Sequence, residues 1–218
     1  IAGNRVTPRE RLVGRDEGVP GDVTLFLSRA SIDALKDAKE TVLSDKHGDK
    51  RFNAPNDLVI DQSGGVYFTD PRFRAPDPWP QGKEAVYYRA ADGKVTRLIE
   101  DRKAPNGVIL SIDEKTLYVV PSMEKEMWAY PVEAPGKLGA PKLLCELKQT
   151  PGANNGGGDG LTIDTDGNLY ITSALGIQVV SPDGKLLGVI AFPEQPANVT
   201  FGGADRKTLY VTARKSLY

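Results

Sequence analysis

The sequence predicts an all-β protein built as a propeller, in which similar small sheets surround a central axis. One pattern occurs four times in the 218 residues: a polar residue, an apolar strand, a tight turn and a second strand that contains Tyr. The copies start about 40–50 residues apart, which is the period of a propeller blade. They occupy residues 56–69, 106–119, 159–172 and 198–212.

Each blade is expected to consist of short antiparallel strands joined by turns. Clusters of Gly, Asp, Asn and Ser separate the apolar segments, as is typical of tight turns. Asp70 and Asp164 are interpreted as turn residues. The strands of the first predicted blade cover residues 57–61, 65–69, 85–90 and 94–99. The next blades are predicted over residues 107–147, 160–192 and 198–218, the last with three strands.

Residues 8–40 interrupt this regularity, and we interpret them as an irregular insertion or a partial blade. They include a strand-like segment at 23–27 and a predicted helix at 31–39, with a further strand expected at 41–44. The recognisable blades cover residues 41–218, and we expect one domain over residues 1–218. A ring of six blades needs about 270 residues. The chain is therefore predicted to be a small propeller or a part of a larger one.

Composition excludes several classes of function. The 28 basic and 29 acidic residues give a net charge of −1, so no strong field would attract nucleic acid or an anionic membrane. No apolar segment approaches the ~18 residues of a membrane helix. Cys145 is the single cysteine and is expected to be a buried strand residue. We expect a soluble protein, either cytoplasmic, or periplasmic or secreted with its N-terminus missing; the oligomeric state is open.

Two loops are predicted from composition alone. The segment around His47, the single histidine, is charged and is predicted to be a solvated loop, which leaves no His-based zinc site or Ser-His-Asp triad. The segment 71–82 contains several prolines together with Phe73 and Trp79. It is either a stiff surface connection or a lid over one mouth of the axis.

The polar residues that open the four copies form the candidate site. Equivalent residues of successive blades surround one axis, so these four side chains are expected to converge at one mouth. Side-chain oxygens of Asn and Asp are ligands that hard cations bind. Each Asn-Gly or Asp-Gly pair could instead be a simple turn, and this structural interpretation is favoured for Asn198. The four residues are Asn56, Asn106, Asp159 and Asn198.

Four motifs in order resemble the gluconolactonase family, which includes senescence marker protein (regucalcin). They are residues 53–61 with 66–71, 104–107 with 115–119, 158–164, and 197–203 with 208–212. The resemblance implies a six-bladed β-propeller, with about four blades in this chain, that opens sugar lactones. It also implies a divalent cation at the top of the axis, first Ca²⁺, with Zn²⁺, Mn²⁺ or Mg²⁺ as alternatives.

The resemblance also assigns roles to three residues. Asn106 and Asp159 match metal ligands of the family, Asp159 also matches its general base, and Asn56 matches a residue of the substrate site. The family's third protein ligand is a Glu that has no clear match here. Glu10 and Glu17 lie in the irregular segment and lack its context. The segment after Tyr118 and the Gly before Asp159 also depart from the family pattern, which leaves the choice of substrate open.

Lactone hydrolysis requires a polarised carbonyl and an activated water. A bound cation supplies the first, and the Asp159 carboxylate could accept the proton of the water. The incomplete ligand set predicts weak metal affinity and impaired catalysis in this chain. The alternative is a non-catalytic propeller that binds metal or sugar. A lyase or a phosphotriester hydrolase on the same scaffold also stays open.

Overall fold

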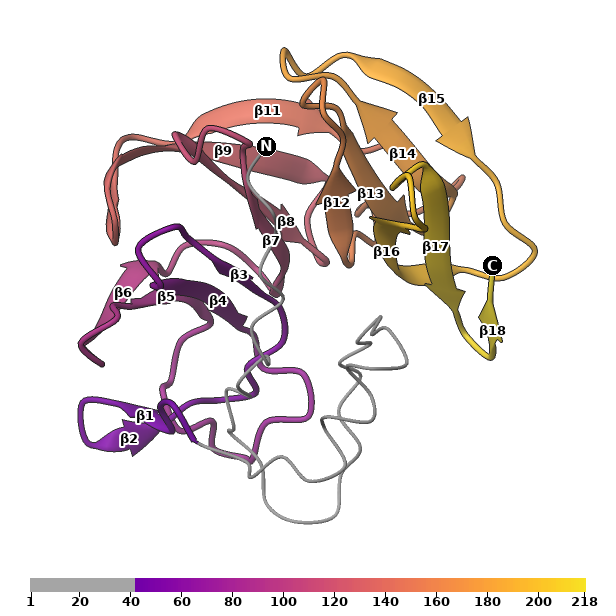
Figure 1. Ribbon diagram of the computed structural model, residues 1–218. Helices are drawn as coiled ribbons and strands as arrows, with labels where there is room; N and C mark the ends of the chain where they lie inside the picture. Colours follow the sequence, from indigo (N-terminus) through magenta and orange to yellow (C-terminus); the bar gives the residue numbers. More distant parts are fainter. Residues whose placement is uncertain (1–41) are drawn as a thin grey trace, which may run out of the picture.

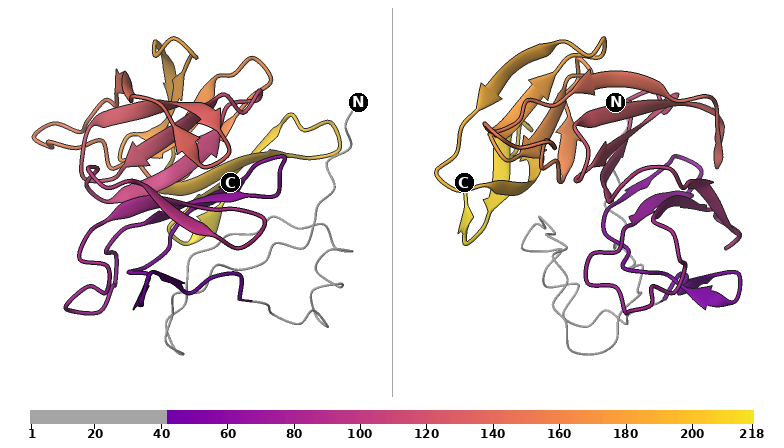
Figure 2. Two further views of the ribbon diagram at one scale, coloured as in Figure 1. Left: turned by 90° about the vertical axis from the view of Figure 1, so that its left-hand side faces the viewer. Right: turned by 180° about the vertical axis from the view of Figure 1, so that it is seen from behind.

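The computed structural model describes residues 42–218, which form a two-stranded hairpin and then four successive blade sheets along an arc (Figure 1). Figure 2 shows the same succession from the side and from behind. These sheets confirm the predicted all-β propeller architecture with about four blades. The expected helix at 31–39, the strand at 23–27 and the whole of segment 8–40 lie outside the described residues. No helix within residues 42–218 is long and apolar enough to cross a membrane.

The first blade has the predicted strands with small shifts of their ends, and the second covers nearly its predicted range of 107–147. In both, each strand pairs antiparallel with the next. The first blade contains β3 (Leu58–Ile60), β4 (Val66–Asp70), β5 (Ala85–Arg89) and β6 (Val95–Ile99). The second contains β7 (Pro105–Leu110), β8 (Thr116–Pro121), β9 (Glu126–Ala134) and β11 (Lys142–Glu146). The short strand β10 (Lys137–Leu138), which was not predicted, pairs with the far end of β9.

The last two blades also follow the prediction. The third has four antiparallel strands and the fourth has three. The third contains β12 (Leu161–Ile163), β13 (Leu169–Ser173), β14 (Gly176–Val180) and β15 (Leu186–Ile190). The fourth contains β16 (Pro196–Gly202), β17 (Thr208–Ala213) and β18 (Ser216–Leu217).

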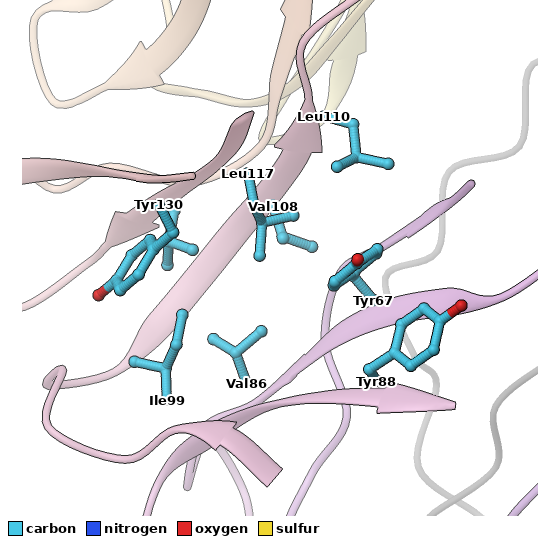
Figure 3. Packing of buried hydrophobic residues seen from close by; sticks show 9 residues of the cluster. Tyr67, Val86, Tyr88, Ile99, Val108, Leu110, Leu117 and Tyr130 are labelled. Atoms are coloured by element: carbon cyan, nitrogen blue, oxygen red, sulfur yellow. The ribbon is translucent and has the colours of Figure 1, made fainter. Parts of the chain in front are cut away.

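Each of the first three blades packs against its neighbour through apolar side chains. Figure 3 shows the interface between the first two blades, where Tyr67 and Val86 of one sheet face Val108 and Leu117 of the other. Successive strand residues point to opposite faces of a sheet. Val119 therefore faces the first blade, whereas its neighbours Tyr118 and Val120 pack toward the third. Burial on both faces explains why these strands are almost continuously apolar.

Cys145 lies on β11, as predicted, but it is only half-buried against the apolar cluster between the second and third blades. Burial raises the pKa of its thiol to about 11. The thiol is therefore protonated at neutral pH.

The segment around His47 differs from its prediction. Residues 42–44 form no strand, whereas the charged segment that follows forms the hairpin of β1 (Lys46–His47) and β2 (Lys50–Arg51). The side-chain amide of Gln81 explains why this segment forms a hairpin, because it donates to the carbonyl oxygens of His47, Lys50 and Arg51. The His47 ring lies 5.2 Å from that of Tyr87, and burial together with Arg97 lowers its pKa.

Candidate metal and substrate site

The register between the first two strands of each blade shows which residues are equivalent. Leu58 pairs with Phe68, Val108 with Val119, and Leu161 with Ile171. The residues two positions before these leading partners are Asn56, Asn106 and Asp159. They therefore occupy the same position at the entry of the innermost strand in three successive blades, and these inner strands are neighbours in turn.

Asn198 does not occupy that position, which corrects the expectation that four polar residues form one ring. In the fourth blade Val199 pairs with Val211, so the equivalent residue is Ala197. Asn198 instead corresponds to Asp57. Each side chain accepts a hydrogen bond from the next backbone N–H, at 2.8 Å from Leu58 N to Asp57 Oδ1 and 2.8 Å from Val199 N to Asn198 Oδ1. These contacts support a structural role for Asn198, although it lies within β16 and not in the turn that was predicted.

Asn106 is buried at the start of β7, with 5% of its surface exposed. Its side-chain nitrogen donates to Ser122 Oγ at 2.9 Å. Its side-chain oxygen has no hydrogen-bond partner and is one of four such buried side-chain atoms in residues 42–218. A buried acceptor without a partner is costly, and a cation would remove that cost. The oxygen of Asn106 thus has the chemistry of a metal ligand.

Asp159 is half-buried in the segment that leads into β12, and its backbone N–H donates to Thr172 O at 3.1 Å. Its main chain lies against Gly107, the residue after Asn106: a Cβ built on Gly107 would lie 2.3 Å from the carbonyl oxygen of Asp159. The two segments predicted to supply metal ligands are therefore adjacent at the boundary between the second and third blades.

The first blade fixes the main chain at Asn106 and just after it. Thr69 Oγ donates to the carbonyl oxygen of Asn106 at 2.8 Å. The Oδ2 atom of Asp57 accepts a hydrogen bond from Val108 N at 3.1 Å. Asp57 therefore bridges two blades and holds the main chain next to Asn106.

Asn56 is exposed, and its backbone N–H donates to Thr69 O at 2.9 Å. Asp70 holds the segment before it, because its carboxylate accepts from Asn53 N at 2.9 Å and Ala54 N at 2.8 Å. Asp70 is fully buried at the end of β4, so its assignment as a turn residue was wrong, whereas Asp164 accepts turn N–H groups as predicted. Burial raises the pKa of Asp70 to about 7, although both N–H groups and Arg97 oppose the change.

Glu84 anchors the loop that follows β4. Its two carboxylate oxygens accept from Arg72 N at 3.0 Å and from Ala104 N at 2.9 Å. Ala104 has a left-handed φ of 51° and comes two residues before Asn106. The Arg72 guanidinium lies 5.0 Å from the centre of the Trp79 ring. Of the two interpretations of segment 71–82, these contacts support the stiff surface connection. The lid over one mouth of the axis stays a prediction.

The residues that could hold a cation are Asn106 and Asp159. Residues 42–218 contain no group of three His, Cys, Asp or Glu side chains that could hold a metal ion. Glu10 and Glu17 lie outside the described residues. Sequence reasoning missed Ser122, whose hydroxyl contacts both predicted ligand segments. The only signal was that the residues just before it, 119–121, depart from the family pattern.

Fold and site together define a β-propeller whose inner strand entries carry Asn, Asn and Asp. The model of the family described as SMP-30/gluconolactonase/LRE-like region matches residues 12–215, and the chain belongs to this family. The match begins well before residue 41, where the recognisable blades were expected to begin. It therefore takes in most of the segment that sequence analysis treated as irregular.

Individual relatives agree with this assignment. The chain is 33% identical over 185 residues to a gluconolactonase of Zymomonas mobilis, which covers 80% of this chain and 52% of the relative. It is 26% identical to regucalcin of Sus scrofa, with 83% and 61% covered. A solved gluconolactonase of Xanthomonas campestris superposes with a TM-score of 0.70 at 32% identity, covering 82% and 60%. The chain thus spans about half to three-fifths of the length of these relatives.

Proposed function

We propose that this protein opens sugar lactones with the help of a divalent cation held by Asn106 and Asp159, with Ca²⁺ as the first candidate. The observation that carries the proposal is the buried Asn106 oxygen without a partner, next to the segment of Asp159. Membership of the family supports lactonase activity in general. The cation, the ligand set and the individual roles are our inference.

Asp159 and Asn56 have different roles in the proposed hydrolysis. A cation at the site would polarise the lactone carbonyl and lower the pKa of a water molecule. The Asp159 carboxylate accepts the proton of the attacking water. Of the three equivalent residues, Asn56, Asn106 and Asp159, it is the one whose side chain can act as a base. Asn56 is exposed and offers one acceptor and two donor hydrogens to sugar hydroxyls.

Turnover of gluconolactone by the full-length protein tests the proposal. We expect activity that is removed by EDTA and restored by Ca²⁺, Mn²⁺ or Zn²⁺. Asn106→Ala and Asp159→Asn should each lower kcat/KM by about 10²-fold or more. Asp164→Asn, which changes a turn carboxylate at the other end of β12, is the matched control and should keep full activity. No turnover above buffer with any of these cations would refute the proposal.

The same protein also tests the alternative of a binding propeller. Calorimetry would then show heat of ion or sugar binding while no product forms. Binding that depends on Asn106 and Asp159 without turnover would support this alternative and would leave the metal site in place.

A further inference from the structure

We infer that Ser122 is a positioning residue that orients the side-chain amide of Asn106 for cation binding and couples it to the segment of Asp159. This inference rests on the proposed function, since it concerns the same site. It assigns a role to a residue for which the sequence analysis gave none.

The direction of the hydrogen bonds carries the argument. Ser122 Oγ lies 2.6 Å from the carbonyl oxygen of Gly158, which can only accept. A serine hydroxyl has one hydrogen, and this contact uses it. Ser122 Oγ must therefore accept from Asn106, at 2.9 Å, so the Asn106 atom that faces it is the nitrogen. The amide oxygen is left on the other side without a partner.

Ser122 is itself held by the segment that carries Asn106. Its backbone N–H donates to Ala104 O at 2.9 Å, and Pro121 pairs with Pro105 across β8 and β7. On the other side, Gly158 immediately precedes Asp159. One hydroxyl thus joins a side chain of the second blade to the main chain of the third. Such outer contacts fix ligand orientation and commonly change metal affinity by 10–100-fold.

The loss of this hydroxyl should act on cation binding. In Ser122→Ala, nothing would distinguish the nitrogen of the Asn106 amide from its oxygen, and the Gly158 carbonyl would lose its donor. A flipped amide presents hydrogens to the cation. Ser122→Thr keeps the hydroxyl and should restore binding.

Calorimetric titration of the metal-free full-length protein with Ca²⁺ tests the inference, together with thermal unfolding of each metal-free variant. We expect Ser122→Ala to weaken Ca²⁺ binding by at least 10-fold and Ser122→Thr to stay within about 3-fold of the parent. Ser181→Ala is the matched control. It removes a hydroxyl that bonds Asp183 and Lys185 in a turn of the third blade, and it should leave the affinity unchanged.

Equal affinities of Ser122→Ala and the parent would overturn the inference. The inference would also be overturned if Ser122→Thr weakened Ca²⁺ binding as much as Ser122→Ala does. The same holds if unfolding of the metal-free Ser122→Ala protein fully explained its loss of binding. Absence of Ca²⁺ binding by the parent would overturn this inference and the assignment of Ca²⁺ to the site. Binding by the parent without lactone turnover would refute only the lactonase proposal.

Discussion

Gly107 of the second blade lies directly against the main chain of Asp159 in the third. A Cβ on Gly107 would lie 2.3 Å from the Asp159 carbonyl oxygen, closer than real Cβ atoms approach. The pattern recurs one blade later, where a Cβ on Gly160 would lie 2.5 Å from Asn198 Oδ1. Neither glycine has a positive φ. In both pairs glycine therefore serves the close approach of neighbouring strands and does not form a turn.

Gly107→Ala is expected to separate the two candidate ligand segments. The added methyl group should lower the free energy of unfolding by about 1–3 kcal/mol and weaken Ca²⁺ binding. Urea unfolding and calcium titration measure the two effects. Gly188→Ala in β15 is the control, because a Cβ on Gly188 would have no other atom within 4 Å, so the change should alter neither quantity. A Gly107→Ala protein with parental stability and affinity would show that the contact is not needed.

Asn198→Ala is expected to affect stability and not the site. The change removes the hydrogen bond that Val199 N donates to the side chain, which should lower the free energy of unfolding by about 1 kcal/mol. Calcium affinity and lactone turnover should stay at parental values, in contrast to Asn106→Ala. A tenfold loss of calcium affinity in Asn198→Ala would place this side chain at the cation after all.

The strands could be predicted from the sequence because their apolar residues and turns repeat at short range. The register of the fourth copy could not. The Tyr of each second strand follows the opening polar residue after nearly the same number of positions in all four copies, which led to the prediction that Asn198 is equivalent to Asn106. The turns differ in length, however, and the pairing of Val199 with Val211 shifts the frame by one residue. A one-residue shift changes the direction of the side chain.

The site shows the same division between local and remote information. Asn106 and Asp159 stand next to glycine in repeated motifs and were therefore visible. Ser122, Glu84 and Asp70 were not, because their partners are backbone groups of distant segments. Nearly every residue has backbone N–H and C=O groups. The identity of the residue that bonds through its backbone therefore gives no signal in the sequence. The hairpin at His47 was missed for this reason also, since the Gln81 amide holds it through carbonyl oxygens.

Glu84→Ala is expected to loosen the loop between β4 and β5. Two backbone N–H groups, of Arg72 and Ala104, lose their acceptor. Loss of such bonds to a charged group costs on the order of 1–3 kcal/mol. Limited proteolysis should show faster cleavage within residues 72–82. Glu133→Ala, at an exposed ion pair with Lys137, is the control and should leave the cleavage rate unchanged. Equal rates in Glu84→Ala and the parent would contradict the anchoring role.

Asp70 should make the protein less stable as the pH rises from 4 to 7. Burial raises its pKa in the folded state from 3.8 to about 7. Between these values the unfolded chain has released the proton while the folded chain retains it, so rising pH favours unfolding. The expected loss is on the order of 3–4 kcal/mol and is complete above pH 7.

Urea unfolding of the parent and of Asp70→Asn, measured from pH 4 to pH 8, isolates this contribution. Asn does not titrate, so the free energy of unfolding of the variant should fall less steeply over this range, even though the variant is less stable at low pH because its amide cannot accept from both Asn53 and Ala54. Asp113→Asn is the control: the Ser111 hydroxyl and Lys115 N–H lower the pKa of this exposed carboxylate, so its loss should not alter the slope above pH 5. Parallel curves for the parent and Asp70→Asn would mean that the two N–H donors outweigh burial and keep Asp70 ionised in the fold.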